Sequence, residues 1–216
     1  IAGACLDSEC VLLGGETAEM PGHYVGNNFD LAGFSVGCVE KKKILNKNNV
    51  SEGNVLIGVE SSGPHSNGFS LIRKIISESE RPEDEKKLIA LEALKPTILY
   101  PRLVSSILKN HKINSISHIT GGGLTENLPR SIPDNLSIEI DTKSWEMSSL
   151  FNWLKSEGNI SNENMYRIFN CGIGMVFIAE VADQEAICNE ISKMNFKSYK
   201  IGEIKDKSDN KEIVFS

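Results

Sequence analysis

Short apolar runs alternate with glycine-rich or charged segments along most of this chain. Continuous or period-two apolar runs predict strands, and apolar residues at helical spacing predict helices. Strands are predicted at residues 10–13, 30–40, 54–60, 113–119, 136–140, 175–181, 199–204 and 212–215. Helical segments are predicted at residues 1–10, 69–78, 97–110, 124–130, 148–156, 162–166 and 184–194. Strands that alternate with helices predict a layered α/β fold.

Two polar segments interrupt this pattern. Residues 81–87 form a charged run, which predicts a solvated loop or a short helix. Residues 41–51 are basic and rich in asparagine, and they form the predicted bridge between two domains. We therefore expect one domain over residues 1–48 and a second over residues 49–216.

Composition excludes several classes of function. A hydrophobic share of 40% and a charged share of 24% are typical of a globular protein in water. The net charge of −6 argues against a nucleic-acid-binding surface. No apolar run approaches the roughly 20 residues of a membrane span, and the first ten residues do not resemble a signal peptide. We expect a cytoplasmic protein that binds neither membrane nor nucleic acid.

The five cysteines give no sign of a metal site or a disulfide framework. Their number is odd and no two of them form a CxxC pair, so zinc is not expected. Packed or idle thiols in a reducing compartment are the expected state, and Cys171 is predicted to be a packed thiol.

Three glycine-rich loops follow predicted strands. They occupy residues 14–22, 61–68 and 120–123, and the second and third lead into predicted helices. In the first, paired glycines are expected to turn the backbone sharply. Glycine-rich turns at helix N-termini present backbone N–H groups to anions, and phosphate is the usual occupant. None of the loops has the Walker A or GxGxxG pattern, so the residues alone do not specify a nucleotide.

Four side chains in or near these loops suit phosphate chemistry. Glu16 and Glu19 could bind Mg²⁺ or orient ligand hydroxyl groups. His65 could transfer a proton or contact a phosphate, and Arg130 could clamp one. Each has a structural alternative, such as a surface acid or a loop histidine bonded to the backbone. The combination of three loops favours a ligand site over those alternatives.

Six segments together resemble one enzyme family. In chain order they read GGETAEMPGHY, DLAGFSVGCVE, SSGPHSNGFSLIRKI, HITGGGLTENLPR, SWEMSSLFNWL and NMYRIFNCGIGM. The chain is similar to phosphoribosylformylglycinamidine cyclo-ligases, the aminoimidazole ribonucleotide synthetases of purine biosynthesis. The resemblance implies a mixed sheet of the α+β type flanked by helices. It also implies the end of an N-terminal ATP-binding domain over residues 1–48, followed by the family's C-terminal domain.

The resemblance implies a reaction in which ATP activates the amide oxygen of formylglycinamidine ribonucleotide. An amidine nitrogen then closes the imidazole ring, and ADP and phosphate are released. ATP, Mg²⁺ and a homodimer of the full-length enzyme are implied as well. The family's DGVGTK-type motif is absent from these residues. We therefore expect this chain alone to be inactive.

Site residues follow from the same resemblance. His65, Glu16 and Glu19 are expected to be catalytic, and Glu16 or Glu19 could also hold the metal. The expected substrate- and phosphate-binding residues are Gly14, Gly15, Thr17, Ser66, Asn67, Gly68, Thr120, Gly121, Gly122, Gly123 and Arg130. Two alternatives remain open: another ATP-dependent enzyme of this superfamily, or a non-catalytic module that binds a phosphorylated ligand.

Overall fold

The computed structural model describes residues 1–207 and 211–216. The chain divides into two compact units, Ile1–Ile44 and Leu45–Ser216, and each is described by itself. The division falls within the predicted bridge at residues 41–51, just before the expected boundary between residues 48 and 49. Lys47 and Val50 belong to the second unit. The Lys47 ammonium pairs with the Asp134 carboxylate at 2.8 Å, and Val50 is buried.

The first unit contains little regular structure. Its elements are helix α1 (Ala2–Asp7), which confirms the predicted helical start, and the 3₁₀ turn η1 (Lys41–Lys43). The strands predicted at residues 10–13 and 30–40 are wrong, because these residues are exposed and in no strand. An apolar run forms a strand only when a neighbouring strand accepts its backbone hydrogen bonds, and no described strand pairs with either segment.

The second unit is built on one six-stranded sheet. Its strands are β1 (Val55–Glu60), β2 (Ser115–His118), β3 (Leu136–Ile140), β4 (Ile173–Ala179), β5 (Ser198–Asp206) and β6 (Ile213–Phe215). The spatial order is β2-β4-β1-β5-β3-β6. The β3–β6 pair is parallel and the other four pairs are antiparallel, which confirms a mixed sheet. All six strands were predicted, with boundaries a few residues away.

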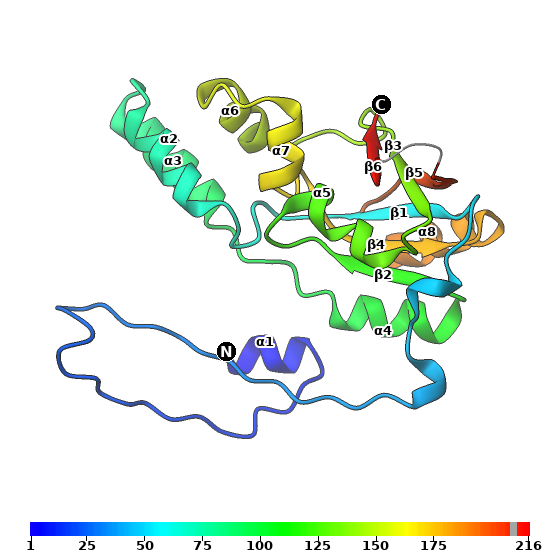
Figure 1. Ribbon diagram of the computed structural model, residues 1–216. Coiled ribbons are helices and arrows are strands. Elements are labelled where there is room, and N and C mark those ends of the chain that lie inside the picture. Colours follow the sequence, from blue (N-terminus) through cyan, green and yellow to red (C-terminus); the bar gives the residue numbers. More distant parts are fainter. Residues whose placement is uncertain (208–210) are drawn as a thin grey trace. The chain divides into compact units, whose positions relative to one another are not determined.

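Helices cover both faces of this sheet. They are α2 (Phe69–Glu78), α3 (Glu83–Ala93), α4 (Pro101–Asn110), α5 (Gly123–Asn127), α6 (Ser149–Glu157), α7 (Asn162–Ile168) and α8 (Gln184–Lys193). Short 3₁₀ turns occur at η2 (Lys47–Asn49), η3 (Pro129–Ser131) and η4 (Val181–Asp183). Figure 1 shows α5, α6 and α7 on one side of the sheet and α4 on the other. No helix in the described ranges is long and apolar enough to cross a membrane.

Three helices differ from the sequence prediction. The helix predicted at residues 124–130 ends at Asn127, and the separate 3₁₀ turn η3 follows it. Most of the charged run at residues 81–87 forms the first part of α3, which has 11 residues and is longer than the predicted loop or short helix. Three acidic residues in its first turn stabilise it, because they complement the helix dipole. Helix α4 begins at Pro101 rather than at residue 97. Proline is favoured at the first helical position and lacks the N–H that a longer helix would use.

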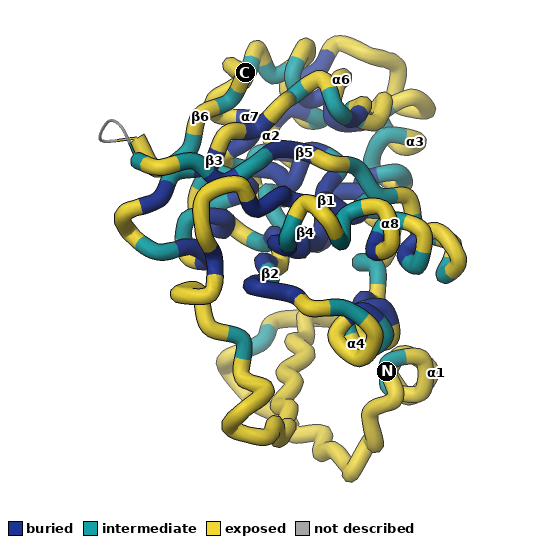
Figure 2. Tube along the Cα trace, turned by 90° about the vertical axis from the view of Figure 1, so that its right-hand side faces the viewer, coloured by how far each residue is buried: buried dark blue, intermediate teal, exposed yellow. Residues whose placement is uncertain are grey.

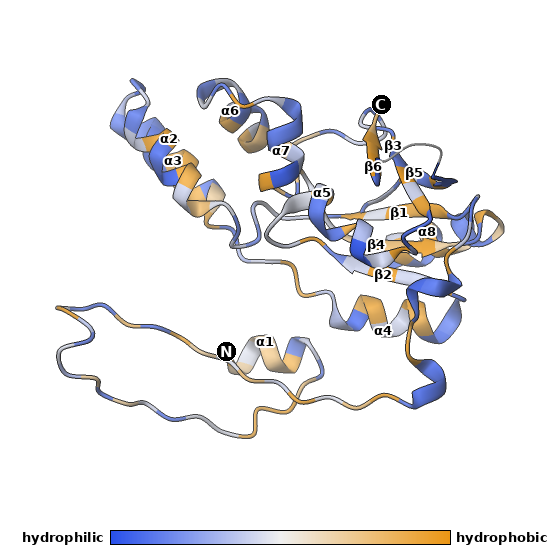
Figure 3. Ribbon diagram, viewed as in Figure 1, coloured by the Kyte–Doolittle hydropathy of each residue, from blue (hydrophilic) through white to orange (hydrophobic). Residues whose placement is uncertain are grey.

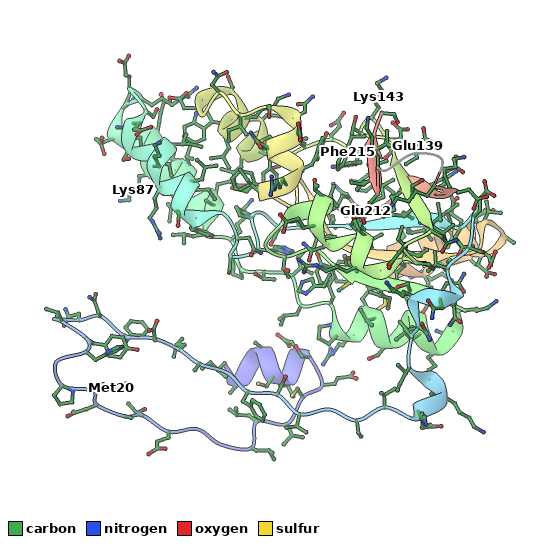
Figure 4. All side chains as sticks on the ribbon, viewed as in Figure 1. Met20, Lys87, Glu139, Lys143, Glu212 and Phe215 are labelled. Atoms are coloured by element: carbon green, nitrogen blue, oxygen red, sulfur yellow. The ribbon has the colours of Figure 1, made fainter. Side chains whose placement is uncertain are left out.

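Two hydrophobic cores lie on the two faces of the sheet. Alternate residues of β1 point to opposite sides: Leu56 joins the core under α2, α5, α6 and α7, whereas Val55 and Ile57 join the core under α4 and α8. The central strands are dark blue in Figure 2, which marks burial, and mainly apolar in Figure 3. At the sheet edge Phe215, labelled in Figure 4, stacks on Tyr166 with ring centroids 4.5 Å apart.

Candidate functional site

Strand pairing brings the second and third glycine-rich loops to one end of the sheet. Strands β1 and β2 both run antiparallel to β4, so their carboxyl ends lie beside the amino end of β4. Residues 61–68 follow β1, residues 119–122 follow β2, and the turn at residues 170–172 precedes β4. Three segments that are far apart in sequence therefore meet at this end, which we call the loop cluster.

Asn170 joins two of these segments through a buried side chain. Its Oδ1 accepts hydrogen bonds from the Ser61 hydroxyl and from the Gly172 N–H, both at 2.9 Å. Its Nδ2 donates to the Gly63 carbonyl at 2.8 Å. A backbone hydrogen bond between the same two segments runs from the Ser61 N–H to the Gly172 carbonyl at 2.8 Å. Because a buried amide must be satisfied, these bonds specify one arrangement of the two loops.

His65 is held within the loop that follows β1. Only 4% of its surface is exposed, and its backbone has a positive φ of 49°. Its Nε2 accepts a hydrogen bond from the Ser62 N–H at 3.0 Å and lies 3.4 Å from the N–H of Ile98. Two N–H groups directed at Nε2 place the ring proton on Nδ1. The His65 ring is therefore a hydrogen-bond acceptor that stabilises the conformation of its own loop.

Electrostatics keep His65 neutral. Burial, with a smaller contribution from nearby His118, lowers the pKa of His65 to about 4. Burial also lowers the pKa of His118. A neutral His65 cannot attract a phosphate as a cation, so the expected phosphate contact would have to come from a hydrogen bond.

Tyr100 packs beside His65 at the base of the loop cluster. The two ring centroids are 6.0 Å apart, and the Tyr100 hydroxyl donates to the Glu60 carbonyl at 2.6 Å. Burial raises the pKa of Tyr100, so its hydroxyl stays protonated. Next to it a pocket of about 520 Å³ is lined mainly by apolar side chains, together with Thr97, Tyr100, Ser105 and His118. The loop cluster thus rests on an aromatic base with apolar space beside it.

Glycine is required where helices leave the loop cluster. Gly68 precedes α2 with a φ of 76°, and Gly122 precedes α5 with a φ of 95°. Side chains other than glycine rarely adopt these angles. A Cβ on Gly68 would also clash with the ring of Phe169, and one on Gly123 would clash with the backbone of α7. Packing therefore sets the directions in which both helices leave the loops.

Asn127 and Asn67 organise the predicted phosphate loops. The Asn127 Nδ2 donates to the carbonyls of Gly121 at 3.1 Å and Gly123 at 2.8 Å. Asn67 Nδ2 donates to the His65 carbonyl at 2.7 Å, and Asn67 Oδ1 lies 3.5 Å from where a Cβ on Gly121 would be. The Asn67 side chain therefore lies beside Gly121, so the two glycine-rich loops are neighbours at this end of the sheet.

Arg130 reaches the loop cluster through an ion-pair group. Its guanidinium lies 3.9 Å from the Glu126 carboxylate, whose other oxygen accepts a hydrogen bond from Arg167 Nε at 3.2 Å. Arg130 comes from η3, Glu126 from α5 and Arg167 from α7. The two arginine side chains are largely exposed, and the Glu126 side chain is partly exposed. We call them the Arg–Glu–Arg group.

The remaining predicted residues lie in the first unit. Gly14, Gly15, Glu16, Thr17 and Glu19 occupy an exposed segment without helix or strand. Neither Gly14 nor Gly15 has a positive φ, so the sharp turn expected there is wrong; the positive angles are at Gly22 and Gly26. A shared site between these residues and the loop cluster stays a prediction.

Several contributors were not singled out as site residues from sequence. Asn170, Asn127, Glu126 and Arg167 lie in the segments quoted above, whereas Tyr100 lies outside them. The partners of Asn170 and the Glu126 partner of Arg167 are distant in sequence, whereas Asn127 bonds within its own loop. Cys171 is the packed thiol that was predicted: it is buried, and burial raises its pKa to about 12. Among described residues, no group of three His, Cys, Asp or Glu side chains is placed to hold a metal ion.

The fold and its loop cluster define an α/β domain with glycine-rich loops at one end of a mixed sheet. Residues 51–215 match the family described as AIR synthase related protein, C-terminal domain, and the chain belongs to this family. A phosphoribosylformylglycinamidine cyclo-ligase of Neisseria meningitidis serogroup C is 44% identical over 212 residues. That match covers 96% of this chain but 61% of the relative, so this chain spans less than two thirds of the relative's length.

Solved structures share the fold at low sequence identity. HypE of E. coli has a TM-score of 0.56 at 13% identity, with 79% of this chain and 48% of HypE covered. AaThiL, solved in complex with AMPPCP and TMP, has a TM-score of 0.52 at 14% identity, with 79% of this chain and 50% of AaThiL covered. These likenesses confirm the fold class that was predicted.

Proposed function

We propose that this chain supplies the C-terminal part of an ATP-dependent cyclo-ligase that converts formylglycinamidine ribonucleotide to 5-aminoimidazole ribonucleotide, with release of ADP and phosphate. Family membership and the name of the Neisseria relative support this assignment. The observation that carries it is the loop cluster, in which strand pairing brings two glycine-rich loops to one end of the sheet. Asn67 and Asn127 each bond within their own loop, and Asn170 joins the first loop to the turn before β4.

The loop cluster suits the ribose phosphate of such a substrate. Residues 66–68 lead into the ten-residue helix α2, whose N-terminus favours negative charge. Residues 120–123 offer a second glycine-rich turn beside the first. In this scheme His65 is a positioning residue, because its Nε2 is occupied by the backbone of its own loop. Positioning of reactants supplies much of the rate acceleration in phosphoryl transfer.

ATP and Mg²⁺ complete the proposal. AaThiL, which shares the fold, was solved with AMPPCP, and this supports a nucleotide as co-substrate. Glu16 and Glu19 are proposed for the ATP side, where a carboxylate could hold Mg²⁺ together with phosphate oxygens. The remaining proposals are cytoplasmic location, a homodimer of the full-length enzyme, and no turnover by the 216-residue chain alone.

A chimera tests the function most directly. The region of the Neisseria cyclo-ligase that aligns with this chain would be replaced by residues 1–216, and formation of aminoimidazole ribonucleotide from ATP and substrate would be measured. We expect activity within about tenfold of the Neisseria enzyme, a margin of about 1.4 kcal/mol in the barrier. A folded chimera without turnover would contradict the proposal.

Calorimetry and a turnover assay on the 216-residue chain test whether it binds the substrate without hydrolysing ATP. We expect formylglycinamidine ribonucleotide to bind and ATP turnover to be absent. If the substrate binds but the chimera is inactive, a non-catalytic module becomes the better description. Turnover by the 216-residue chain at the rate of the Neisseria enzyme would show that the chain carries a complete active site.

A further inference from the structure

The Arg–Glu–Arg group joins three elements next to a glycine-rich loop. Arg167 Nε donates to Glu126 Oε1 at 3.2 Å, and Arg130 Nη2 approaches Glu126 Oε2 at 3.9 Å. Arg130 and Glu126 are four residues apart, whereas Arg167 comes from α7. Two guanidinium groups therefore converge on one carboxylate.

This carboxylate lies against the predicted phosphate loop. A Cβ built on Gly122 would be 2.7 Å from both the Cβ and the Oε2 of Glu126. The side chain of Glu126 thus folds back over the turn that begins α5, and glycine at position 122 leaves room for it. The carboxylate therefore lies beside the Gly122 turn as well as beside the two guanidinium groups.

The contacts of this carboxylate are weak enough to exchange. The Glu126 side chain is 43% exposed, and those of Arg130 and Arg167 are 68% and 64% exposed. Exposed ion pairs of this kind contribute only about 0–1 kcal/mol. Guanidinium groups bind phosphate with the same planar geometry as carboxylate, and a phosphate dianion carries more charge.

We propose that Arg130 and Arg167 form a clamp for a phosphate monoester, and that Glu126 is an internal counterion which the phosphate displaces. This inference rests on the proposed function, in which the ligand is the ribose phosphate of the substrate. It assigns a ligand-binding role to Arg167 and a restraining role to Glu126. In the absence of ligand, Glu126 keeps the two arginines oriented toward the loop.

Ribose 5-phosphate is the probe that tests the clamp on the 216-residue chain. Dissociation constants would be measured by calorimetry at low salt for wild type, Arg167→Gln, Arg130→Gln and Glu126→Gln. Each arginine variant should bind about tenfold more weakly, the factor expected for the loss of one charge-assisted hydrogen bond. Glu126→Gln should bind about threefold more tightly, because the competing charge is gone.

Arg81→Gln is the matched control. Arg81 also pairs with two carboxylates, Glu85 at 2.9 Å and Glu157 at 3.8 Å, but it lies beyond the C-terminal end of α2. The Arg81→Gln variant makes the same change of charge and should leave the dissociation constant for ribose 5-phosphate within twofold of wild type. Circular dichroism would confirm that each variant is folded.

These outcomes distinguish a failure of the proposed clamp from a failure of the proposed cyclo-ligase function. Weaker binding by Glu126→Gln, or unchanged binding by Arg167→Gln, would overturn the clamp even if the chimera is active. The expected pattern together with an inactive chimera would support the clamp and contradict the cyclo-ligase assignment. Equal losses in Arg81→Gln and Arg167→Gln would show that only net charge matters, and this too would overturn the clamp.

Discussion

Replacing Asn170 with alanine should destabilise the second unit and loosen the loop cluster. Its side chain is 2% exposed and makes three hydrogen bonds, to the Ser61 hydroxyl, the Gly172 N–H and the Gly63 carbonyl. At about 1 kcal/mol for each bond, the free energy of unfolding should fall by about 3 kcal/mol. The Gly63 carbonyl and the Gly172 N–H lose this partner in the variant, and the methyl group of alanine cannot replace either hydrogen bond.

Urea unfolding followed by tryptophan fluorescence would measure this loss. Trp145 is a suitable reporter, because its Nε1 donates to the Cys171 carbonyl in the same turn at 2.9 Å. Asn152→Ala is the control: Asn152 is exposed and makes one bond, to the Met147 carbonyl, so it should cost less than about 1 kcal/mol. If Asn170→Ala costs no more than Asn152→Ala, the amide does not hold the loops together.

Two further predictions concern His65 and Gly174. The pKa of His65 falls from 6.5 to about 4 on folding, so the unfolded chain binds more protons between these values and stability should rise as pH increases from 4 to 6.5. His65→Gln should flatten this rise in urea titrations but not abolish it, since His118 acts in the same direction; an unchanged slope would exclude a neutral buried His65. Gly174→Ala should cost about 1–3 kcal/mol, because its Cβ would clash with the Tyr100 hydroxyl and the His65 ring. Gly33→Ala, where no atom lies within 4 Å of the added Cβ, should be neutral in the same unfolding assay, and a neutral Gly174→Ala would show that the aromatic base can shift freely.

Helices and strands of the second unit were predictable because each has its own local pattern. Helix α2 matches its predicted range of residues 69–78, where apolar side chains recur at helical spacing and Gly68 marks the start. The segment at residues 30–40 shows the limit of this reasoning. Its apolar residues suit a strand, but Phe34 and Val36 are exposed, because a strand also needs a partner to accept its hydrogen bonds.

Residue types in the glycine-rich loops were enough to predict an anion site, since glycine permits the backbone angles found at Gly68 and Gly122. Which loops meet was decided by strand pairing. Ser61 and Asn170 are 109 residues apart in sequence, yet they share a hydrogen bond because β1 and β4 pair antiparallel. The state of His65 was also decided there: a histidine in a loop suggested catalysis, and burial against Tyr100 made it a neutral acceptor. Sequence pattern records what each segment can form, whereas long-range packing selects the partners that give each side chain its charge and its role.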